Sequence, residues 1–556
     1  MSTPTPLSKL LAALSCVCWA LSTPAAAQTT APPGTVDVAL RTGVFRGVTQ
    51  VNGPDKFLGI PFAQPPVGNL RFKAPVPITE PSTEIFDASA FGDACPQPAN
   101  PPGLTLGAAI GEDCLRLNVF RPANISSDAK LPVMVWLHGG AYTINAASNP
   151  QYDPSDFIQR SIAIGKPIVF VSSNYRLNTF GFLASADMPP EDLNAGLLDQ
   201  RIALEFVQDN IAAFGGDPEK VTIWGQSSGA GSVEAHFLFP ANRTLFRAGI
   251  ADSCTGPFKN SPPPSTFDKP GKPFARLLEA TGCAAGTGAI ACLQAVPFDT
   301  LLNISNAMVS ATLNHQLWEP STGPAGNIAF EPASKRINSG DFLHLPFIGG
   351  TNVNDGTMFS TTLFGLGLSG QAEDDAFKNF IFNLVIDNAT LTNNVVDAFV
   401  SMYPANDPAN GAPFATGDSL FDRAAAWYTD TMFVAPRRFF FQRAANLQPM
   451  FAYLFGEFIQ GNNPELGVAH QTELQMIFGA DPPVSALESE FSTTFRDFYI
   501  NFVNDLNPGP AWPRFSPESP KVLQLIRDNI TLIPDTFNQH QVDFSNSPLV
   551  LAELQR

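Results

Sequence analysis

Short apolar runs alternate with amphipathic stretches along most of the chain. Six runs have the length and composition of buried strands, at residues 131–138, 167–173, 220–224, 248–253, 345–351 and 450–456. Helical patterns lie between several of them, and within residues 197–214 the apolar positions recur at steps of three and four. Strands that are apolar on both faces need cover on both sides. The pattern therefore predicts an α/β fold, in which a large, mostly parallel sheet carries helices on both faces.

Length alone does not divide the chain. A chain of 556 residues could form three or four domains by size. However, no Gly/Ser-rich linker, block of charge or internal repeat marks a boundary. We expect one large domain over residues 28–556.

The first 27 residues have the features of a secretory signal peptide. Lys9 precedes an apolar run at 10–21 that is too short to span a bilayer, and small residues suit cleavage after Ala27. An N-terminal membrane anchor is the alternative. No other segment approaches about 18 uninterrupted apolar residues, so we expect a secreted, extracellular protein without an integral membrane segment. Possible N-glycosylation sites, which fit that route, are Asn124, Asn242, Asn303, Asn388 and Asn529.

The strong negative charge narrows the possible partners. The formal net charge is −18, and it becomes −19 without residues 1–27, which hold one Lys and no acidic residue. Such a surface repels nucleic-acid phosphates and anionic lipids. We therefore expect no nucleic-acid partner, and the sequence leaves the oligomeric state open.

Five cysteines follow the expected cleavage site, so at least one of them lacks an intramolecular partner. The pairs Cys95–Cys114 and Cys283–Cys292 would each close a short loop. The first loop encloses 18 residues, and closing it would stabilise the fold by about 3 kcal/mol in the chain-entropy model. Cys254 then remains, and a buried structural thiol is more common than a nucleophile. No Cys or His pair has metal-ligand spacing, so we expect no metal.

The segment KVTIWGQSSGAGS, residues 220–232, contains a Gly-x-Ser-x-Gly motif between a predicted strand and a helical pattern. In a nucleophile elbow, small neighbours allow a strained turn that exposes the central serine, here Ser227. A glycine-rich loop is the alternative. Ser228 occupies the next position, whose backbone N–H would face an oxyanion.

A serine nucleophile needs a base and an acid, which follow it in the order Ser, acid, His in this class of fold. His315, His344, His470 and His540 are late enough in the chain, and His470, in a loop after a predicted strand, has the best position. Asp355 lies just past the strand at 345–351, although an Asp-Gly turn there has a common structural use.

An oxyanion site is predicted at the end of the strand at 131–138. The sequence WLHGGAY places Gly139, Gly140 and Ala141 there, as in a His-Gly-Gly type of oxyanion loop. Backbone donors at such a position are each worth roughly a hundred- to thousandfold in rate.

Several long motifs of the chain resemble those of the type-B carboxylesterase/lipase family, which has the α/β-hydrolase fold. They are FLGIPFAQPPVGNLRF (57–72), EDCLRLNVFRP (112–122), WLHGGAY, NYRLNTFGFL (174–183), the segment at 194–218 and VTIWGQSSGAGS. The resemblance covers nearly the whole mature chain. It implies Ser227 as nucleophile, His470 as base and Asp355 as acid, with oxyanion donors at Gly140, Ala141 and Ser228. It also implies the disulfides Cys95–Cys114 and Cys283–Cys292.

Four departures from the family pattern stand out. The acid is more often Glu, so the shorter Asp355 requires the His470 loop to approach more closely. Gln226 replaces a usual Glu before the nucleophile, and Ser228 replaces a common Ala while keeping the backbone donor. The loop between Cys95 and Cys114 is short compared with the lid of the family's lipases.

The short loop also bears on the substrate. It holds no aromatic residue, so it lacks the tryptophan that binds choline esters in cholinesterases. We expect little activation at an oil–water interface and hydrolysis of dispersed esters. Residues 358–370 are apolar and close to Asp355, and they fit either an acyl pocket or an ordinary core or surface helix.

The sequence thus predicts a secreted serine hydrolase that cleaves carboxylic esters through an acyl-enzyme, without a cofactor. Its substrates would be small-molecule or lipid esters, including bulky or lipophilic ones. A triacylglycerol lipase or sterol esterase and a feruloyl-type esterase are the alternatives among enzymes. The alternative from another class is a non-catalytic binding protein on the same fold.

Overall fold

The computed structural model describes residues 1, 32–50, 53–99, 104–479 and 486–556. The expected signal peptide, residues 1–27, lies outside the described residues apart from Met1. None of the described helices is long and apolar enough to cross a membrane.

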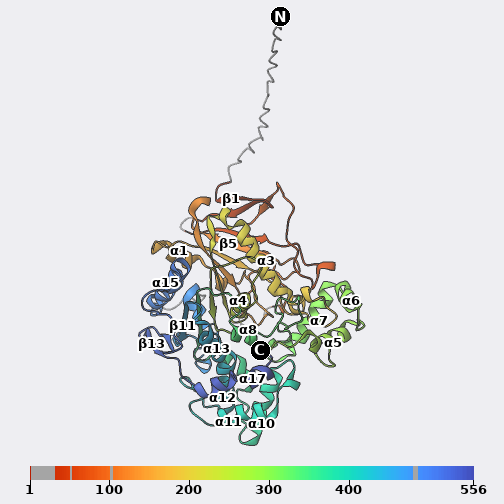
Figure 1. Cartoon of the computed structure of the whole chain (residues 1–556), viewed down its shortest axis with the longest axis vertical. Coiled ribbons are helices and arrows are strands. Elements are labelled where there is room, and N and C mark those ends of the chain that lie inside the picture. The colour runs from red at the N-terminus through yellow and green to blue at the C-terminus, as the bar shows by residue number, and fades with distance from the viewer. Residues whose placement is uncertain (2–31, 51–52, 100–103, 480–485) are drawn as a thin grey trace.

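One mixed sheet runs through the molecule (Figure 1). Its strands lie in the spatial order β1 (Thr35–Leu40), β2 (Gly43–Val48), β3 (Asp55–Pro61), β5 (Arg116–Arg121), β7 (Val169–Ser173), β6 (Leu131–Leu137), β8 (Gly216–Gln226), β9 (Ala248–Asp252), β10 (Phe347–Asn352), β11 (Met450–Phe455), β12 (Lys521–Leu525) and β13 (Thr531–Pro534), and β4 (Ile85–Asp87) pairs with β2. The strands from β7 to β12 are parallel, whereas β1, β2, β3 and β5 are joined antiparallel. This is the α/β-hydrolase architecture, so the predicted fold class is confirmed.

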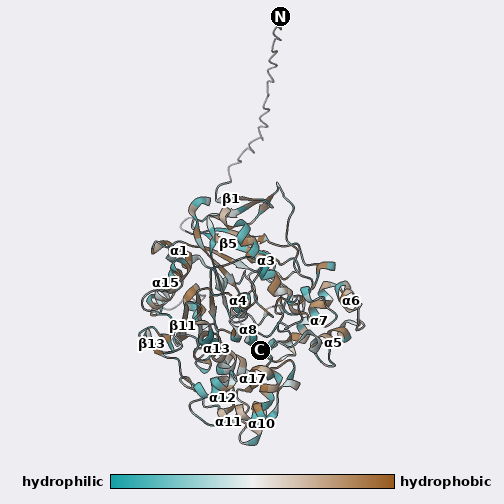
Figure 2. Cartoon of the chain, in the orientation of Figure 1, coloured by the Kyte–Doolittle hydropathy of each residue, from teal (hydrophilic) through white to brown (hydrophobic). Residues whose placement is uncertain are grey.

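Helices surround the sheet (Figure 1). They are α1 (Ser155–Ala163), α2 (Asn178–Phe182), α3 (Ala195–Asn210), α4 (Ser228–Leu238), α5 (Pro273–Thr281), α6 (Ala289–Ala295), α7 (Phe298–Ser310), α8 (Ala333–Ser339), α9 (Thr357–Ser360), α10 (Gln371–Asn383), α11 (Asn393–Met402), α12 (Ser419–Thr429), α13 (Ala435–Ala444), α14 (Thr472–Phe478), α15 (Ser489–Asp505), α16 (Gln539–Ser545) and α17 (Pro548–Glu553). A π-helical turn, Asp430–Val434, joins α12 to α13. Figure 2 shows hydrophobic and hydrophilic residues alternating along the outer helices, as one-sided burial requires.

The two faces of the sheet have separate cores because successive side chains of a strand point in opposite directions. On β6, Val133 and Val135 belong to the core that includes residues of α3, α4 and α13. Met134 and Trp136 belong to the other core, with residues of α1, α14 and α15. The central strands are therefore apolar at consecutive positions, which is why they were recognisable in the sequence.

Each of the six predicted strand segments overlaps a strand. The largest difference is β8, which starts at Gly216, and the predicted helix at 197–214 becomes α3 followed by a 3₁₀ turn at Ile211–Phe214. The antiparallel strands β1 to β3 were not predicted. In β2, buried and half-buried positions alternate, and such half-exposed strands lack a continuous apolar run.

The cysteines form two bridges, Cys95–Cys114 and Cys283–Cys292. Cys254 is free and buried, and burial raises the pKa of its thiol. The five sequon asparagines, Asn124, Asn242, Asn303, Asn388 and Asn529, are all exposed.

A buried carboxylate ties the C-terminal segment to α13. Asp535 is 2% exposed and accepts hydrogen bonds from both Arg437 and Arg438, at 2.7–2.8 Å. Burial alone would raise its pKa, but the charges and hydrogen bonds of the two arginines lower it to about 2. The carboxylate therefore remains ionised above that pH.

We predict that Asp535→Asn destabilises the protein by about 3–5 kcal/mol at pH 7, because it leaves buried guanidinium charges without a counter-ion. The matched control is Asp209→Asn, whose exposed ion pair with Arg243 has an N···O distance of 2.9 Å. That change should alter stability by less than about 0.5 kcal/mol. Urea unfolding of both variants measures the difference, and equal losses would contradict the predicted role of Asp535.

Candidate active site

Ser227 occupies a sharp turn between β8 and α4. Its backbone has φ 59° and ψ −124°, a combination that L-residues rarely adopt. A side chain at Gly225 would overlap the backbone of Gly229, and one at Gly229 would overlap the carbonyl of Leu137. The two glycines of the motif are therefore required by close backbone packing around the serine. Ser227 N–H donates to the carbonyl of Asp252 at 2.9 Å, which attaches the turn to β9.

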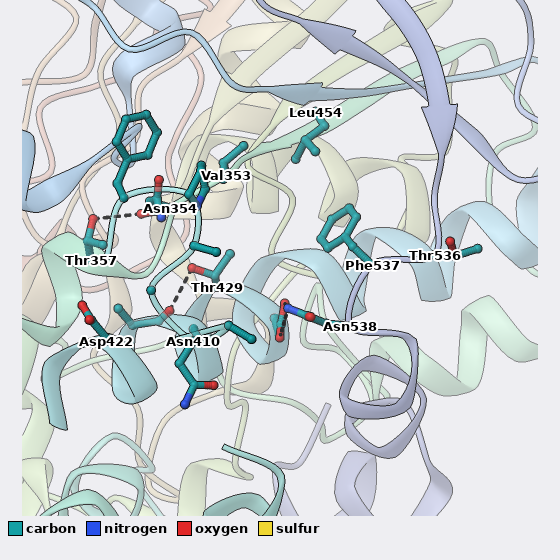
Figure 3. Close-up of a pocket in the computed structure, with 18 of the residues that line it drawn as sticks. Val353, Asn354, Thr357, Asn410, Asp422, Thr429, Leu454, Thr536, Phe537 and Asn538 are labelled. Atoms are coloured by element: carbon teal, nitrogen blue, oxygen red, sulfur yellow. Dashed lines mark hydrogen bonds between the residues drawn. The ribbon is translucent and has the colours of Figure 1, made fainter. Parts of the chain in front are cut away.

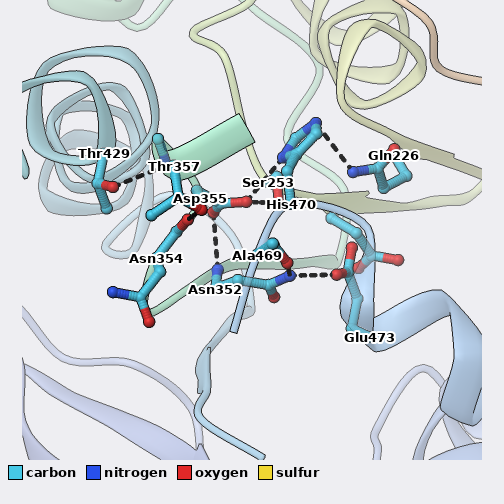
Figure 4. A network of polar contacts seen from close by, with 12 residues as sticks. Gln226, Ser253, Asn352, Asn354, Asp355, Thr357, Thr429, Ala469, His470 and Glu473 are labelled. Atoms are coloured by element: carbon cyan, nitrogen blue, oxygen red, sulfur yellow. Dashed lines mark hydrogen bonds and ion pairs between the residues drawn. The ribbon is translucent and has the colours of Figure 1, made fainter. Parts of the chain in front are cut away.

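Asp355 and His470 meet beside this turn (Figure 4). His470 Nδ1 lies 2.7 Å from Asp355 Oδ1, and the two residues are 4% and 0% exposed. Asp355 Oδ1 also accepts from Ser253 Oγ at 2.9 Å, and Oδ2 accepts from Asn352 N–H at 2.7 Å. These bonds fix the carboxylate in one orientation.

The two loops that carry Asp355 and His470 are joined directly. Asn354 N–H donates to the carbonyl of Val468, and Val468 N–H donates to Asn354 Oδ1, both at 3.1 Å. Asn352 Nδ2 donates to the carbonyl of Ala469 at 2.8 Å. This close approach brings the short Asp355 side chain within hydrogen-bonding distance of the imidazole.

The other ring nitrogen of His470 faces Gln226. The Gln226 Nε2 donor lies 3.1 Å from His470 Nε2, which leaves the ring proton on Nδ1, toward Asp355. This tautomer has its lone pair on Nε2, as a general base requires. Among the described residues, no hydrogen bond joins Ser227 Oγ to the His470 ring. The rings of Phe359 and Phe433 lie against the imidazole, with centroids 5.1 and 4.9 Å away.

The strip after β6 offers backbone donors. Gly140 has φ 119° and Ala141 has φ 56°, and the described residues provide no acceptor for the N–H groups of Gly140, Ala141 or Ser228. Ser228 Oγ accepts from Tyr142 N–H at 3.2 Å. The hydroxyl that replaces the family's alanine therefore links the two segments that would form an oxyanion hole.

Two further carboxyl groups lie behind the Asp355–His470 pair. Burial, followed by the charges of Asp252 and Asp355, raises the pKa of Glu473, and Asn352 Nδ2 donates to its carboxyl group. Burial raises the pKa of Asp252 to about 6, against hydrogen bonds from three aromatic side chains. A neutral Glu473 adds no negative charge beside the pair.

Several of these residues were not identified from the sequence. Ser253 is the last residue of a predicted strand, and Glu473 lies three residues after His470, so position gave a weak indication of both. The contact of Gln226 with His470 joins residues 244 apart and had no local signature. Among residues 358–370, Phe359 packs on His470, whereas Phe364, Leu366 and Leu368 are exposed.

Two other buried histidines are structural. Burial lowers the pKa of His138 to about 4 and that of His236 to about 3. The His138 ring stacks on Tyr175 with centroids 4.4 Å apart. Both rings are therefore neutral at neutral pH and pack within the core.

Two cavities lie near the site. A small one is lined by Ser227, Ser228, Ala141 and Tyr142, among others. A larger one of about 590 Å³ is lined by Val353, Asn354 and Thr357, but not by Ser227, Asp355 or His470 (Figure 3). The small cavity is the place where a reacting group can approach the serine.

A parallel sheet that presents a serine in such a turn, beside a buried Asp–His pair, is the arrangement that serine hydrolases use for acyl transfer. The class of protein is thus a serine hydrolase with the α/β-hydrolase fold. The carboxylesterase family matches residues 35–545. The chain belongs to that family and is an ester-hydrolysing enzyme.

Individual relatives agree with this placement. Secreted lipase 1 of Botryotinia fuckeliana is 34% identical over 535 residues, covering 88% of this chain and 89% of the relative. Para-nitrobenzyl esterase of Bacillus subtilis is 30% identical over 516 residues, covering 90% and 96%. The crystal structure of Aspergillus niger EstA superposes with a TM-score of 0.78 at 26% identity, covering 94% of this chain and 99% of EstA.

The Gln226 contact yields a pH prediction. In Gln226→Glu a carboxylate would lie beside His470 Nε2 and stabilise the imidazolium. The acidic limb of the pH profile of kcat/KM should then move to higher pH, by about 1 unit. The control, Gln226→Leu, removes the amide without adding charge. Coincident profiles for Gln226→Glu and the wild type would show that residue 226 does not act on the titrating base.

Proposed function

We propose that Ser227, His470 and Asp355 form the catalytic triad of a carboxylic ester hydrolase. The observation that carries this proposal is the 2.7 Å contact between Asp355 Oδ1 and His470 Nδ1 next to the strained serine turn. For catalysis, His470 Nε2 must exchange Gln226 for Ser227 Oγ as its partner. Catalytic hydrogen bonds are often long in free enzymes and shorten when substrate binds.

The mechanism runs through an acyl-enzyme. His470 Nε2 takes the Ser227 proton while Oγ attacks the ester carbonyl carbon, and the backbone N–H groups of Gly140, Ala141 and Ser228 stabilise the oxyanion. His470 then gives the proton to the leaving alcohol. Water, deprotonated by His470, attacks the acyl-enzyme and releases the acid. Asp355 orients the imidazole and stabilises its charged form.

We propose broad carboxylesterase activity on dispersed esters, including bulky or lipophilic ones. The relatives include both an esterase and lipases, and they support ester hydrolysis without fixing the substrate. The short Cys95–Cys114 loop is bound to the strip after the oxyanion site: Gln97 and Asn145 exchange hydrogen bonds of 2.6 and 2.9 Å, and Ser148 Oγ donates to Leu106. The described parts of the loop, on either side of residues 100–103, are held in this way and do not need an interface to open them.

A triacylglycerol lipase is the second candidate. A relative named secreted triacylglycerol lipase, from Gibberella zeae, is 32% identical over 550 residues. The exposed apolar side chains of Phe364, Leu366 and Leu368 near the Asp355 turn would suit a lipid surface. Sterol and feruloyl esters remain alternatives of the same reaction type.

We further propose a secreted protein whose residues 28–556 form one catalytic domain after removal of residues 1–27. Relatives named as secreted, the two disulfide bridges and the five exposed sequons support an extracellular, glycosylated product.

Ser227→Ala should lower kcat by roughly a millionfold, because the nucleophile is lost. Ser228→Ala is the matched control: it keeps the backbone donor and loses only the bond from Tyr142 N–H, so its loss should stay below about a hundredfold. Hydrolysis of p-nitrophenyl esters from acetyl to palmitoyl measures both variants. Comparable rates for Ser227→Ala and the wild type would refute the assignment.

The fixed loop predicts the kinetics on lipids. The rate on tributyrin should follow one saturation curve through the solubility limit, because no lid has to open at the interface. Titration in a pH-stat, above and below that limit, measures it. A sharp rise once droplets form would favour the lipase and exclude the fixed-loop interpretation.

A further inference from the structure

The small cavity at Ser227 contains a pair of opposite charges. Lys259 and Glu319 line it together with Ser227, Ala141 and Tyr142. The triad mechanism uses neither charged residue. A cavity for plain alkyl groups would gain nothing from them, because burying charge is costly.

Lys259 is fixed in position but has hydrogen-bond donors without a partner among the described residues. Its ammonium donates to Tyr428 Oη at 2.7 Å and lies over the rings of Phe359, Tyr428 and Phe433, with Nζ 4.4, 4.9 and 5.1 Å from the centroids. The ammonium has three N–H donors, and one of them has a hydrogen-bond acceptor among the described residues. Burial lowers the pKa of Lys259, and the charge of Glu319 opposes that shift.

Glu319 is the complementary group. It is 6% exposed, and its carboxyl group has neither a hydrogen bond nor an ion pair within 4.0 Å among the described residues. Burial raises its pKa, while the charge of Lys259 lowers it. The Glu319 carboxyl group is therefore free to accept a hydrogen bond from a molecule that enters the cavity.

The chemistry of the pair selects the kind of group that fits. A hydroxyl both accepts and donates hydrogen bonds, so it suits a cavity that presents an ammonium donor and a carboxyl acceptor, and it adds no charge. A methylene group would leave both unpaired, and a carboxylate would meet repulsion from Glu319.

The position of the cavity indicates which part of the ester enters it. Its lining includes two of the three expected oxyanion residues, Ala141 and Ser228, but not His470. The leaving alcohol must lie at His470, which protonates it, so the acyl group is the part that extends into this cavity. Its free volume is about 10 Å³, which is room for about one water-sized group, so it favours the shortest acyl chains.

We propose that Lys259 and Glu319 form a subsite for a hydroxyl group on the acyl chain, so that esters of short hydroxy acids are preferred substrates. This proposal rests on the proposed function. Sites built to bind a substrate hydroxyl discriminate strongly against analogues that lack it, because the site's polar groups are then left unpaired.

The wild-type test compares matched methyl esters in a pH-stat: 2-hydroxypropanoate with propanoate, 3-hydroxybutanoate with butanoate, and 6-hydroxyhexanoate with hexanoate. At one chain length, kcat/KM for the hydroxylated ester should exceed that of its partner at least tenfold. Ratios near one at all three lengths would overturn the subsite. Preference for the monomethyl ester of succinic acid over every hydroxy ester would overturn it as well.

Variants then test the two side chains. Lys259→Met and Glu319→Leu should each lower the best ratio at least fivefold, whereas Lys335→Met, which removes an exposed lysine paired with Glu331, should keep it. Because a ratio is independent of the amount of folded enzyme, partial misfolding does not obscure it. An unchanged ratio in both subsite variants would refute the proposal.

The same measurements distinguish failure of the proposed function from failure of the subsite. Ester hydrolysis that survives in Ser227→Ala would contradict the triad. A rate that depends on Ser227 but shows no hydroxyl preference would contradict the subsite alone.

Discussion

The positive-φ turn at Ser227 is the constraint around which the site is organised. It can close only where three backbones meet without side chains between them, and Gly225 and Gly229 provide that space against Leu137. The turn must also be attached to the neighbouring strand. The hydrogen bond from Ser227 N–H to the carbonyl of Asp252, at the end of β9, attaches it. A strained backbone persists only when its surroundings determine it, and here they are the central, fully buried strands of the sheet.

The Asp355–His470 pair depends on a second arrangement, in which two loops are joined before the side chains meet. Asn352 and Asn354 bond to the backbone around residues 468–469, so the distance between acid and base is set by loop backbone. Burial keeps Glu473 toward its neutral form. The imidazole thus has one nearby carboxylate partner and two aromatic walls.

The sequence predicted the parts of this protein that depend on local chemistry. Buried parallel strands appear as apolar runs, and the serine turn requires glycines at fixed positions, so both were recognisable. The antiparallel strands β1 to β3 were missed, and in β2 the reason is one-sided burial, which leaves no continuous apolar run. The contact of Gln226 with His470, and the presence of Lys259 and Glu319 in one cavity, could not be predicted, because each joins segments that only the folded chain brings together. Whether Ser227, Asp355 and His470 act as proposed is a question for kinetics.

The π-helical turn at Asp430–Val434 has a consequence for how the site can change over evolution. A π turn holds one more residue than the α-helix around it, and it shifts the angular phase of everything that follows. Asp430, at its start, lines the larger cavity and accepts hydrogen bonds from Tyr403 and Asn538, whereas Phe433 lies against His470. Loss of that single extra residue would rotate the following side chains by about 100°. The position of the aromatic ring beside the imidazole therefore depends on the number of residues in this helical segment as much as on which residues they are.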